Sequence, residues 1–153
     1  MKAQEEFTEI KDSTDPVYTL GVASKLSSTP VHSVRQYIDR GLILPYKTDT
    51  NRHLFSEVDI LRLRCIRRYL DDQGLNIAGI NAIFSLVPCW IIKPCSVEDR
   101  NKCDAYSSVT EPCWKAAVKG PECRNTDCRI CDVYRLPEQC TDMKNFIKKI
   151  TNT

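Results

Sequence analysis

Histidine is scarce in this chain of 153 residues: there are two, His32 and His53, and none follows residue 53. Glycine is scarce too, at five residues, which excludes collagen-like and glycine-rich low-complexity structure. No apolar run approaches the roughly 20 residues that cross a membrane. The first 15 residues lack the basic start and apolar centre of a secretory signal. We therefore expect a cytoplasmic protein with no membrane partner.

The chain is rich in cysteine, and the cysteines are concentrated in one segment. Eight of the nine lie between Cys89 and Cys140. This segment is also duplicated: Pro88-Cys89-Trp90 returns as Pro112-Cys113-Trp114, and Cys103-Asp104-Ala105-Tyr106 returns as Cys131-Asp132-Val133-Tyr134. Structural disulfides are disfavoured in a reducing cytosol. The pattern therefore predicts a metal site first, with disulfides or redox-active thiols as the alternative.

A site built here would have a pure thiolate ligand set, because no histidine or clustered carboxylate lies nearby. Such a set suits an iron–sulfur cluster, which would give a redox signal, or structural zinc, which is redox-inert. Only Cys128-Arg129-Ile130-Cys131 is a C-x-x-C, so a zinc ribbon with two knuckles is not matched. Eight thiols can form two four-coordinate sites, or one site with spare or paired cysteines. The candidate ligands are Cys89, Cys95, Cys103, Cys113, Cys123, Cys128, Cys131 and Cys140. Cys65 is expected to be a buried small apolar residue and no ligand.

Positive charge is concentrated before the cysteines. Residues 16–70 contain nine Lys or Arg and four Asp or Glu, an excess of about five positive charges. An excess of this size suits a polyanion such as DNA, although a solvated basic face is the alternative.

The same region predicts two short helices, a hairpin and two further helices. Leu20, Val22, Ala23 and Leu26 form an apolar stripe, Thr29 is the expected N-cap of the second helix, and Gly41 is its expected left-handed end. A hairpin, or wing, is expected around residues 47–52. The motif Ser56-Glu57-Val58-Asp59 resembles a capping box and opens a helix with a core stripe at Val58, Leu61, Cys65 and Tyr69. Asn76 is the expected cap of the last helix, which ends before Pro88.

These residues resemble the DNA-binding domain of the MerR family of bacterial regulators, in its heat-shock-repressor-like branch. The order and spacing of the motifs hold from about Tyr18 to Val87. The motifs that carry the resemblance are Tyr18-Thr19-Leu20-Gly21-Val22-Ala23, Val34-Arg35-Gln36-Tyr37, Gly41-Leu42, Phe55-Ser56-Glu57-Val58-Asp59-Ile60-Leu61-Arg62-Leu63 and Gly74-Leu75-Asn76-Ile77.

The resemblance implies a winged helix-turn-helix that binds promoter DNA as a homodimer and acts on RNA polymerase indirectly, by changing the twist and bend of the DNA. The implied contact residues are His32, Ser33, Arg35, Gln36 and Tyr37 on the recognition helix, with Lys47, Arg52 and His53 on the wing. Arg35 would read a base edge, while Tyr37 and the wing would hold phosphates. The alternative for Tyr37 is a ring in the core.

The family's long dimerisation helix is missing, because Pro88-Cys89 follows the fourth helix directly. The short helix containing Met143, Phe146, Ile147 and Ile150 would either pair subunits or cap the cysteine module. The segment from Cys89 to Tyr134 itself resembles the duplicated cysteine–tryptophan modules of bacterial sensory proteins.

The predicted fold is mainly α: a winged helix-turn-helix of four short helices and a small β-hairpin wing, followed by a small cysteine-rich metal-binding module. Its expected parts are a disordered acidic tail (1–15), the DNA-binding domain (16–87), the cysteine-rich module (88–140) and a short C-terminal helix and tail (141–153). We predict a transcriptional regulator, not an enzyme, whose module senses redox state or metal. The alternative is a zinc-stabilised DNA-binding or protein-interaction adaptor with no redox sensing.

Overall fold

The structure is a computed structural model that describes residues 14–135 and 142–151. Most of the predicted acidic tail, and Cys140, lie outside the described residues. The chain divides into two compact units, Met1–Arg68 and Tyr69–Thr153. The division falls within a helix, α4 (Glu57–Asp71), and therefore earlier than the predicted change of region at residues 87–88.

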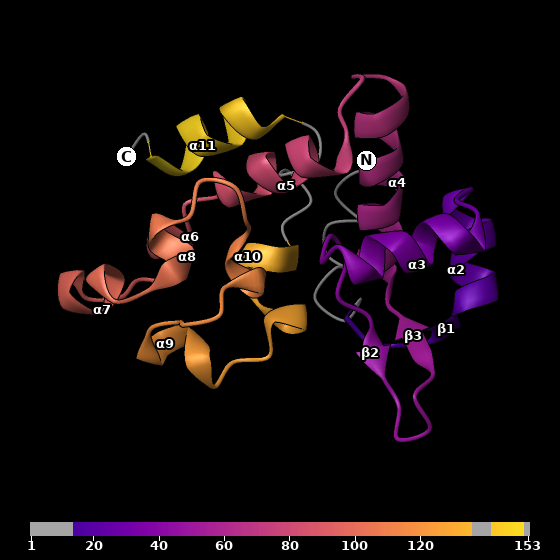
Figure 1. The fold of residues 1–153 in the computed structure, drawn as a ribbon, viewed down its shortest axis with the longest axis horizontal. Helices are drawn as coiled ribbons and strands as arrows, with labels where there is room; N and C mark the ends of the chain where they lie inside the picture. The colour runs from indigo at the N-terminus through magenta and orange to yellow at the C-terminus, as the bar shows by residue number, and fades with distance from the viewer. Residues whose placement is uncertain (1–13, 136–141, 152–153) are drawn as a thin grey trace, which may run out of the picture. The chain divides into compact units, whose positions relative to one another are not determined.

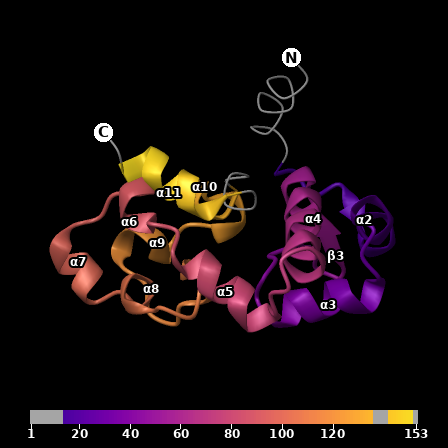
Figure 2. The ribbon, with the colours of Figure 1, turned by 90° about the horizontal axis from the view of Figure 1, so that it is seen from above.

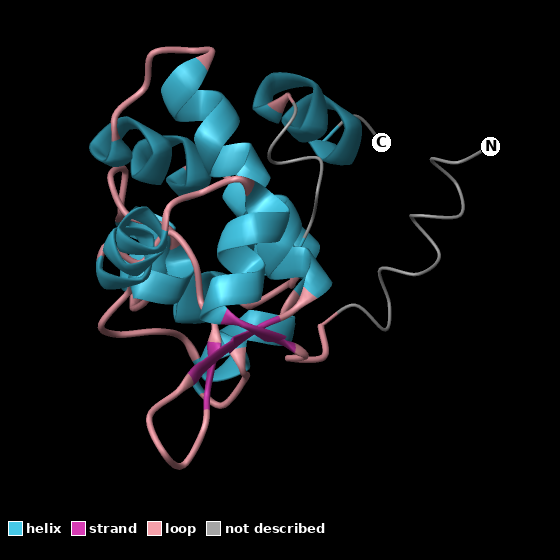
Figure 3. Ribbon diagram, turned by 90° about the vertical axis from the view of Figure 1, so that its right-hand side faces the viewer, coloured by secondary structure: helices cyan, strands magenta, loops and turns pink. Residues whose placement is uncertain are grey.

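The first unit combines short helices with a small antiparallel sheet (Figure 1). Its elements before α4 are β1 (Tyr18–Thr19), α2 (Leu20–Ser27), α3 (Val31–Asp39), β2 (Tyr46–Lys47) and β3 (His53–Phe55). The strands lie in the order β1-β3-β2. Tyr46 pairs with Leu54 in the predicted hairpin. The sequence analysis missed β1, in which Tyr18 pairs with Phe55 on the other edge of β3 (Figure 3).

Local hydrogen bonds explain where α2 and α3 begin and end. The Thr19 hydroxyl accepts from the Val22 N–H at 3.4 Å, and Ser28 ends α2 in the left-handed conformation. The prediction that Thr29 caps α3 is wrong: Pro30 occupies the cap position. The buried Thr29 hydroxyl instead donates to the Ser27 carbonyl at 3.2 Å, within the turn between the two helices.

The start of α4 is the predicted capping box. The Ser56 N–H donates to Asp59 Oδ2 at 2.9 Å, and the Asp59 N–H donates to Ser56 Oγ at 3.3 Å. Val58 and Cys65 are buried as expected, but Cys65 is disulfide-bonded, which the sequence analysis did not expect, and Leu61 is 39% exposed. Its neighbours Ile60 and Leu63 are buried instead, so the buried face of the helix is centred beside Leu61 and not on it.

The second unit begins with the end of α4 and α5 (Ile77–Ser85), and continues in short helical pieces. Asn76 caps α5 as predicted, accepting from the Gly79 N–H at 2.7 Å. The other pieces are α6 (Cys89–Ile92), α7 (Val97–Asn101), α8 (Asp104–Ser107), η2 (Cys113–Lys115), α9 (Pro121–Arg124), η3 (Cys128–Ile130), α10 (Asp132–Arg135) and α11 (Met143–Thr151). Among the described residues, no helix has the length and apolar character needed to cross a bilayer.

The apolar face of α11 belongs to the core of the second unit. Phe146 is buried in a cluster with Val87 and Val133, and Met143, Ile147 and Ile150 pack against that cluster. The helix lies beside α6 (Figures 1 and 2). Of the two roles left open by the sequence, the structure favours the one in which α11 caps the cysteine-rich module.

Candidate functional site

The exposed face of α3 is polar and its inner face is apolar. Val34 is buried, and Tyr37 is only 2% exposed, so its ring is part of the core. His32, Arg35 and Gln36 are exposed on the same helix, and Ser33 is half-buried. His32, Arg35 and Gln36 are therefore accessible to a DNA groove. Tyr37 is a core residue, which was the alternative for that position.

The end of α3 is fixed by the residues that follow it. Gly41 has φ +72°, a left-handed conformation that costs glycine little. The Leu42 N–H donates to the Tyr37 carbonyl at 2.9 Å. Leu42 and Ile43 are fully buried behind the helix. This anchoring holds the exposed face of α3 in a defined orientation within the first unit.

The wing is a tight loop closed by a threonine. The Thr48 N–H donates to the Arg52 carbonyl at 2.9 Å, and the Arg52 N–H donates to Thr48 Oγ1 at 3.1 Å. Asn51 turns the chain with φ +62°. The loop extends beyond the sheet (Figure 3), with Lys47 and Arg52 exposed and His53 half-buried. These two cations are well placed for phosphate contacts.

Two arginines of α4 have structural roles that the sequence analysis missed. Arg62 is only 3% exposed and donates through Nε to the Leu42 carbonyl at 3.0 Å. Arg64 donates through Nε and Nη2 to the Leu26 carbonyl, at 3.3 and 3.0 Å, and so satisfies a carbonyl in the last turn of α2. A stripe of Ile60, Leu63 and Ile66 on both sides of Arg62 was the available signal that it is buried.

Seven of the predicted thiols meet at one cavity in the second unit. The cavity measures about 40 Å³, and its lining includes every described cysteine of the repeats. All seven are free and half-buried: Cys89, Cys95, Cys103, Cys113, Cys123, Cys128 and Cys131. Cys140, the eighth candidate, lies outside the described residues.

The thiols surround this cavity without forming a coordination shell. In the described parts of the chain, no group of three or more His, Cys, Asp or Glu side chains is arranged so that it holds a metal ion. Tetrahedral zinc with Zn–S bonds of about 2.3 Å brings its sulfur atoms to about 3.8 Å from one another. Binding a metal therefore requires these sulfurs to move inward.

Burial and mutual repulsion keep the central thiols neutral. Burial, followed by the charges of Cys123, Cys103 and Cys95, raises the pKa of Cys89 to about 11. Burial raises the pKa of Cys113 still further, with Cys89, Cys128, Cys131 and Cys123 adding to it. For Cys123, burial raises the pKa, Lys93 opposes the shift, and Cys131, Cys103 and Cys128 add to it.

Cationic side chains line the same cavity, a feature that the sequence analysis did not identify. Lys119 Nζ lies 3.3 Å from Cys128 Sγ, within hydrogen-bonding distance. Lys93 and Arg100 also line the cavity, and the buried Nε of Arg100 has no hydrogen-bond partner. Asp99 and Glu122 contribute acidic groups to the lining. An anionic thiolate centre would be stabilised by the three cations.

The sequence duplication is also a structural duplication. Trp90 and Tyr106 pack edge to face with ring centroids 5.2 Å apart and an interplanar angle of 82°. Trp114 and Tyr134 form the equivalent pair at 5.2 Å and 86°. Their surroundings differ, because Tyr134 is 1% exposed and Tyr106 is 42% exposed. Phe84 of α5 packs on the second pair, 5.9 Å from the Trp114 ring.

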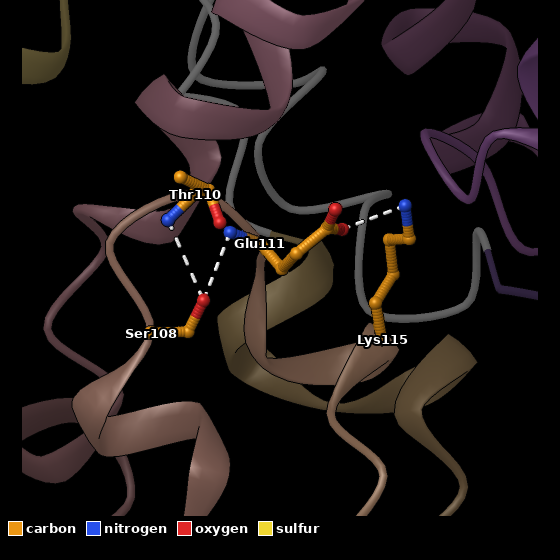
Figure 4. Close-up of polar contacts among 4 residues, drawn as sticks. All are labelled: Ser108, Thr110, Glu111 and Lys115. Carbon is orange, nitrogen blue, oxygen red and sulfur yellow. Dashed lines mark hydrogen bonds and ion pairs between the residues drawn. The ribbon is translucent and has the colours of Figure 1, made fainter.

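The loop before the second Pro-Cys-Trp is held by short-range polar contacts (Figure 4). Ser108 Oγ accepts from the backbone N–H groups of Thr110 and Glu111, at 3.4 and 3.1 Å. Glu111 and Lys115 then form an ion pair of 2.6 Å across one helical turn. The two residues of this pair lie on either side of Cys113 in the sequence of the second repeat.

Comparison with known proteins finds similarity to a described family over less than half of this chain. Residues 18–86 match the family model described as MerR HTH family regulatory protein. The HspR protein of Streptomyces coelicolor is 38% identical over 71 residues, covering 46% of this chain and 47% of that protein. The HTH-type transcriptional regulator GlnR of Bacillus anthracis is 37% identical over 68 residues, covering 44% and 52%. The chain thus spans about half the length of these curated relatives, and both alignments are shorter than half of this chain.

Proposed function

We propose, from the MerR-type helix-turn-helix region at residues 18–86, that this chain is a DNA-binding transcriptional regulator. We further propose that its cysteine-rich half holds a metal and transmits the redox or occupancy state of that metal to the DNA-binding half. RNA polymerase would respond indirectly, through the shape of the promoter. The relatives named above support the first part, and the cavity supports the second.

The DNA-binding part rests on charge and exposure. Arg35 and Gln36 are exposed on α3, and Lys47 and Arg52 are exposed on the wing. A long planar donor such as Arg35 suits a guanine edge in the major groove. The wing cations suit the backbone phosphates, which give affinity and its dependence on salt. His32 is the remaining exposed candidate on the recognition helix.

One observation supports a link between the DNA-binding region and the cysteine-rich region: α5 is part of the first by sequence and packs against the second. The helix lies inside the family-matching residues and packs in the second unit on the aromatic pair of the second repeat. Val87, directly after α5, is buried with Val133 of that repeat. A change in the cysteine cavity that moves Trp114 would therefore reach a helix of the DNA-binding region through a direct contact.

The cavity suits a metal that prefers sulfur. Its seven thiols favour zinc or an iron–sulfur cluster. Zinc would supply folding free energy, whereas a cluster would supply a redox change. The chain's own contribution is the same in both cases: thiols supplied by both repeats, cations beside them, and an aromatic pair that links the site to α5.

We propose a homodimer on a near-palindromic site, by analogy with the implied family arrangement. The apolar face of α11 is already committed to its own core. We therefore assign the dimer contact to a different surface of the chain.

The test measures metal content and DNA affinity on the same full-length protein. Duplexes selected from a random library under anaerobic conditions would be used in fluorescence anisotropy. Replacing Cys113 and Cys131 together by Ser is expected to lower both metal content and DNA affinity. Replacing Arg35 by Ala is expected to lower DNA affinity alone, which makes it the control for intact metal binding.

Three outcomes separate the parts of this proposal. If the double cysteine variant loses metal and keeps its affinity, the coupling is wrong and the metal only folds the module. If both properties stay unchanged, the cysteines have neither role. If no duplex is enriched by the wild-type protein, the DNA-binding part is wrong.

A further inference from the structure

The aromatic pairs of the two repeats have the same geometry but are covered differently. Trp114 and Tyr134, the pair of the second repeat, are 7% and 1% exposed, and Phe84 of α5 packs on Trp114. In the first repeat Tyr106 is 42% exposed, and among the described residues no third ring packs on its pair with Trp90. The duplication therefore contains one aromatic pair that is covered within the chain and one that is not.

The residue after each tryptophan also differs between the repeats. Ile91 follows the first Pro-Cys-Trp, and Lys115 follows the second. Lys115 forms an ion pair with Glu111, which suits a position at the surface. Ile91 is 40% exposed at the equivalent position. The first repeat thus has an exposed apolar side chain beside Trp90 where the second repeat has a charged one.

We propose that the face defined by Trp90, Ile91 and Tyr106 binds the same face of a second copy of this chain. The inference rests on the homodimer part of the proposed function and assigns that dimer a surface. In an interface with two-fold symmetry, each contact occurs twice. Ile91 of each copy would lie against the aromatic pair of the other, as Phe84 lies against the second pair within one chain.

The charges around this face favour a second copy over DNA or a strongly charged protein. Residues 89–107 contain three Lys or Arg and three Asp or Glu, so the first repeat has no net charge. Lys102 and Glu98 form an exposed ion pair just before α8, the helix that contains Tyr106. Two copies of a balanced surface do not repel each other, and each sign can meet the opposite sign of the partner. Residues 16–70, with their excess of about five positive charges, would repel a second copy.

The first aromatic pair is suited to binding because its rings are already ordered. They pack edge to face at 5.2 Å and 82°, which is close to the geometry of the buried second pair. A pre-formed aromatic surface loses less conformational freedom on association than free side chains do. Tyrosine and tryptophan are also enriched at the centres of protein interfaces. The contact forms only at concentrations where two copies associate, so the stability of dilute single chains does not contain it.

Sedimentation velocity of the full-length protein tests the assignment. The wild-type chain of 17.5 kDa is expected to sediment as a dimer of twice that mass at micromolar concentration. Ile91→Lys introduces the residue that the second repeat has at the equivalent, exposed position, so the fold should tolerate it. This variant is expected to raise the dissociation constant of the dimer at least about tenfold, because each copy loses an apolar contact and places a charge in the interface.

Ile130→Lys is the matched control. It makes the same change at a residue of the second repeat that is 48% exposed, outside the proposed face, and is expected to leave the dissociation constant unchanged. The near-ultraviolet circular dichroism of both variants is expected to match that of the wild type, which would show that both are folded.

A second measurement needs no variant. In a mixed sample of two differently isotope-labelled wild-type chains, nuclear Overhauser effects are expected between the Ile91 methyl groups of one copy and the Tyr106 ring of the other. Intermolecular effects that involve neither residue would overturn the assignment.

The outcomes distinguish this inference from the proposed function. Unchanged dimerisation of Ile91→Lys, or equal dissociation of Ile91→Lys and Ile130→Lys, would overturn the assigned face and leave a homodimer standing. A wild-type chain that stays monomeric, both free and bound to DNA, removes the homodimer part of both proposals. Neither result affects the DNA-binding or metal-binding part of the proposed function.

Discussion

The two aromatic pairs provide an internally controlled test of how burial sets stability. Both pairs have the same ring separation and nearly the same angle, so an edge-to-face term of about 0.5–1.5 kcal/mol is lost in either case. The pairs differ in exposure, at 1% for Tyr134 and 42% for Tyr106. Truncating a fully buried ring to Ala costs about 3–5 kcal/mol. Tyr134→Ala is therefore expected to cost about 3–5 kcal/mol, and Tyr106→Ala about 1–2 kcal/mol.

The assay is urea unfolding of the metal-loaded protein, followed by tryptophan fluorescence. Both tryptophans lie in the second unit, so the signal reports on its unfolding. With a slope of about 1–2 kcal/mol per molar urea, the two midpoints should differ by roughly 1–2 M. Tyr46→Ala, an exposed tyrosine of the first unit, is the control and should leave this transition unchanged. Equal shifts for the two variants, or a larger one for Tyr106→Ala, would refute the reasoning.

Three further predictions concern caps, backbone strain and pH. Arg64→Ala removes the donors to the Leu26 carbonyl and should cost about 1 kcal/mol by thermal unfolding, whereas the exposed Arg68→Ala should cost close to nothing; equal losses would contradict the capping role. Gly74→Ala should cost about 1–2 kcal/mol through its φ of +65° alone, because nothing lies within 4 Å of the added Cβ; an unchanged melting temperature would show that the loop relaxes. In metal-free, reduced protein the folded-state pKa of Cys89 is raised to about 11, from an ordinary value of 9.0. Its contribution to stability is therefore complete below about pH 9 and lost as the pH rises through 11. The urea midpoint should be lower at pH 10.5 than at pH 8, and this decrease should be smaller for Cys89→Ala. A midpoint that rises with pH would contradict this.

The sequence predicted the parts of the fold that depend on near neighbours. The capping box at Ser56 and Asp59 and the cap at Asn76 are confirmed, because each is a hydrogen bond across three residues. The positions of Leu61 and Thr29 were predicted wrongly. Ile60 and Leu63 are buried where Leu61 was expected, and Thr29 donates within the turn before α3 where a cap was expected. Periodicity alone predicts neither outcome.

The candidate site shows the same contrast between what near neighbours in the sequence predict and what only the fold decides. The residue types predicted a thiolate site, and seven of the eight candidate thiols line one cavity. The spacing did not show that Cys123 is a neighbour of Cys89, because 34 residues separate them along the chain. The cations beside the thiols were missed for the same reason: Lys119 and Cys128 meet only once η3 is placed. Arg62 was missed because arginine is rarely buried, and here a backbone carbonyl compensates for its burial.

The contact between Phe84 and Trp114 has a practical consequence for dissecting the molecule. A fragment that ends at residue 86, where the family match ends, would keep Phe84 and remove the aromatic ring that covers it. The newly solvated ring would favour self-association of such a fragment. A fragment that begins at Pro88 would in turn expose Trp114. The end of the family match is therefore not a boundary between folding units. A fragment that is expected to fold on its own must contain α5 together with the repeats.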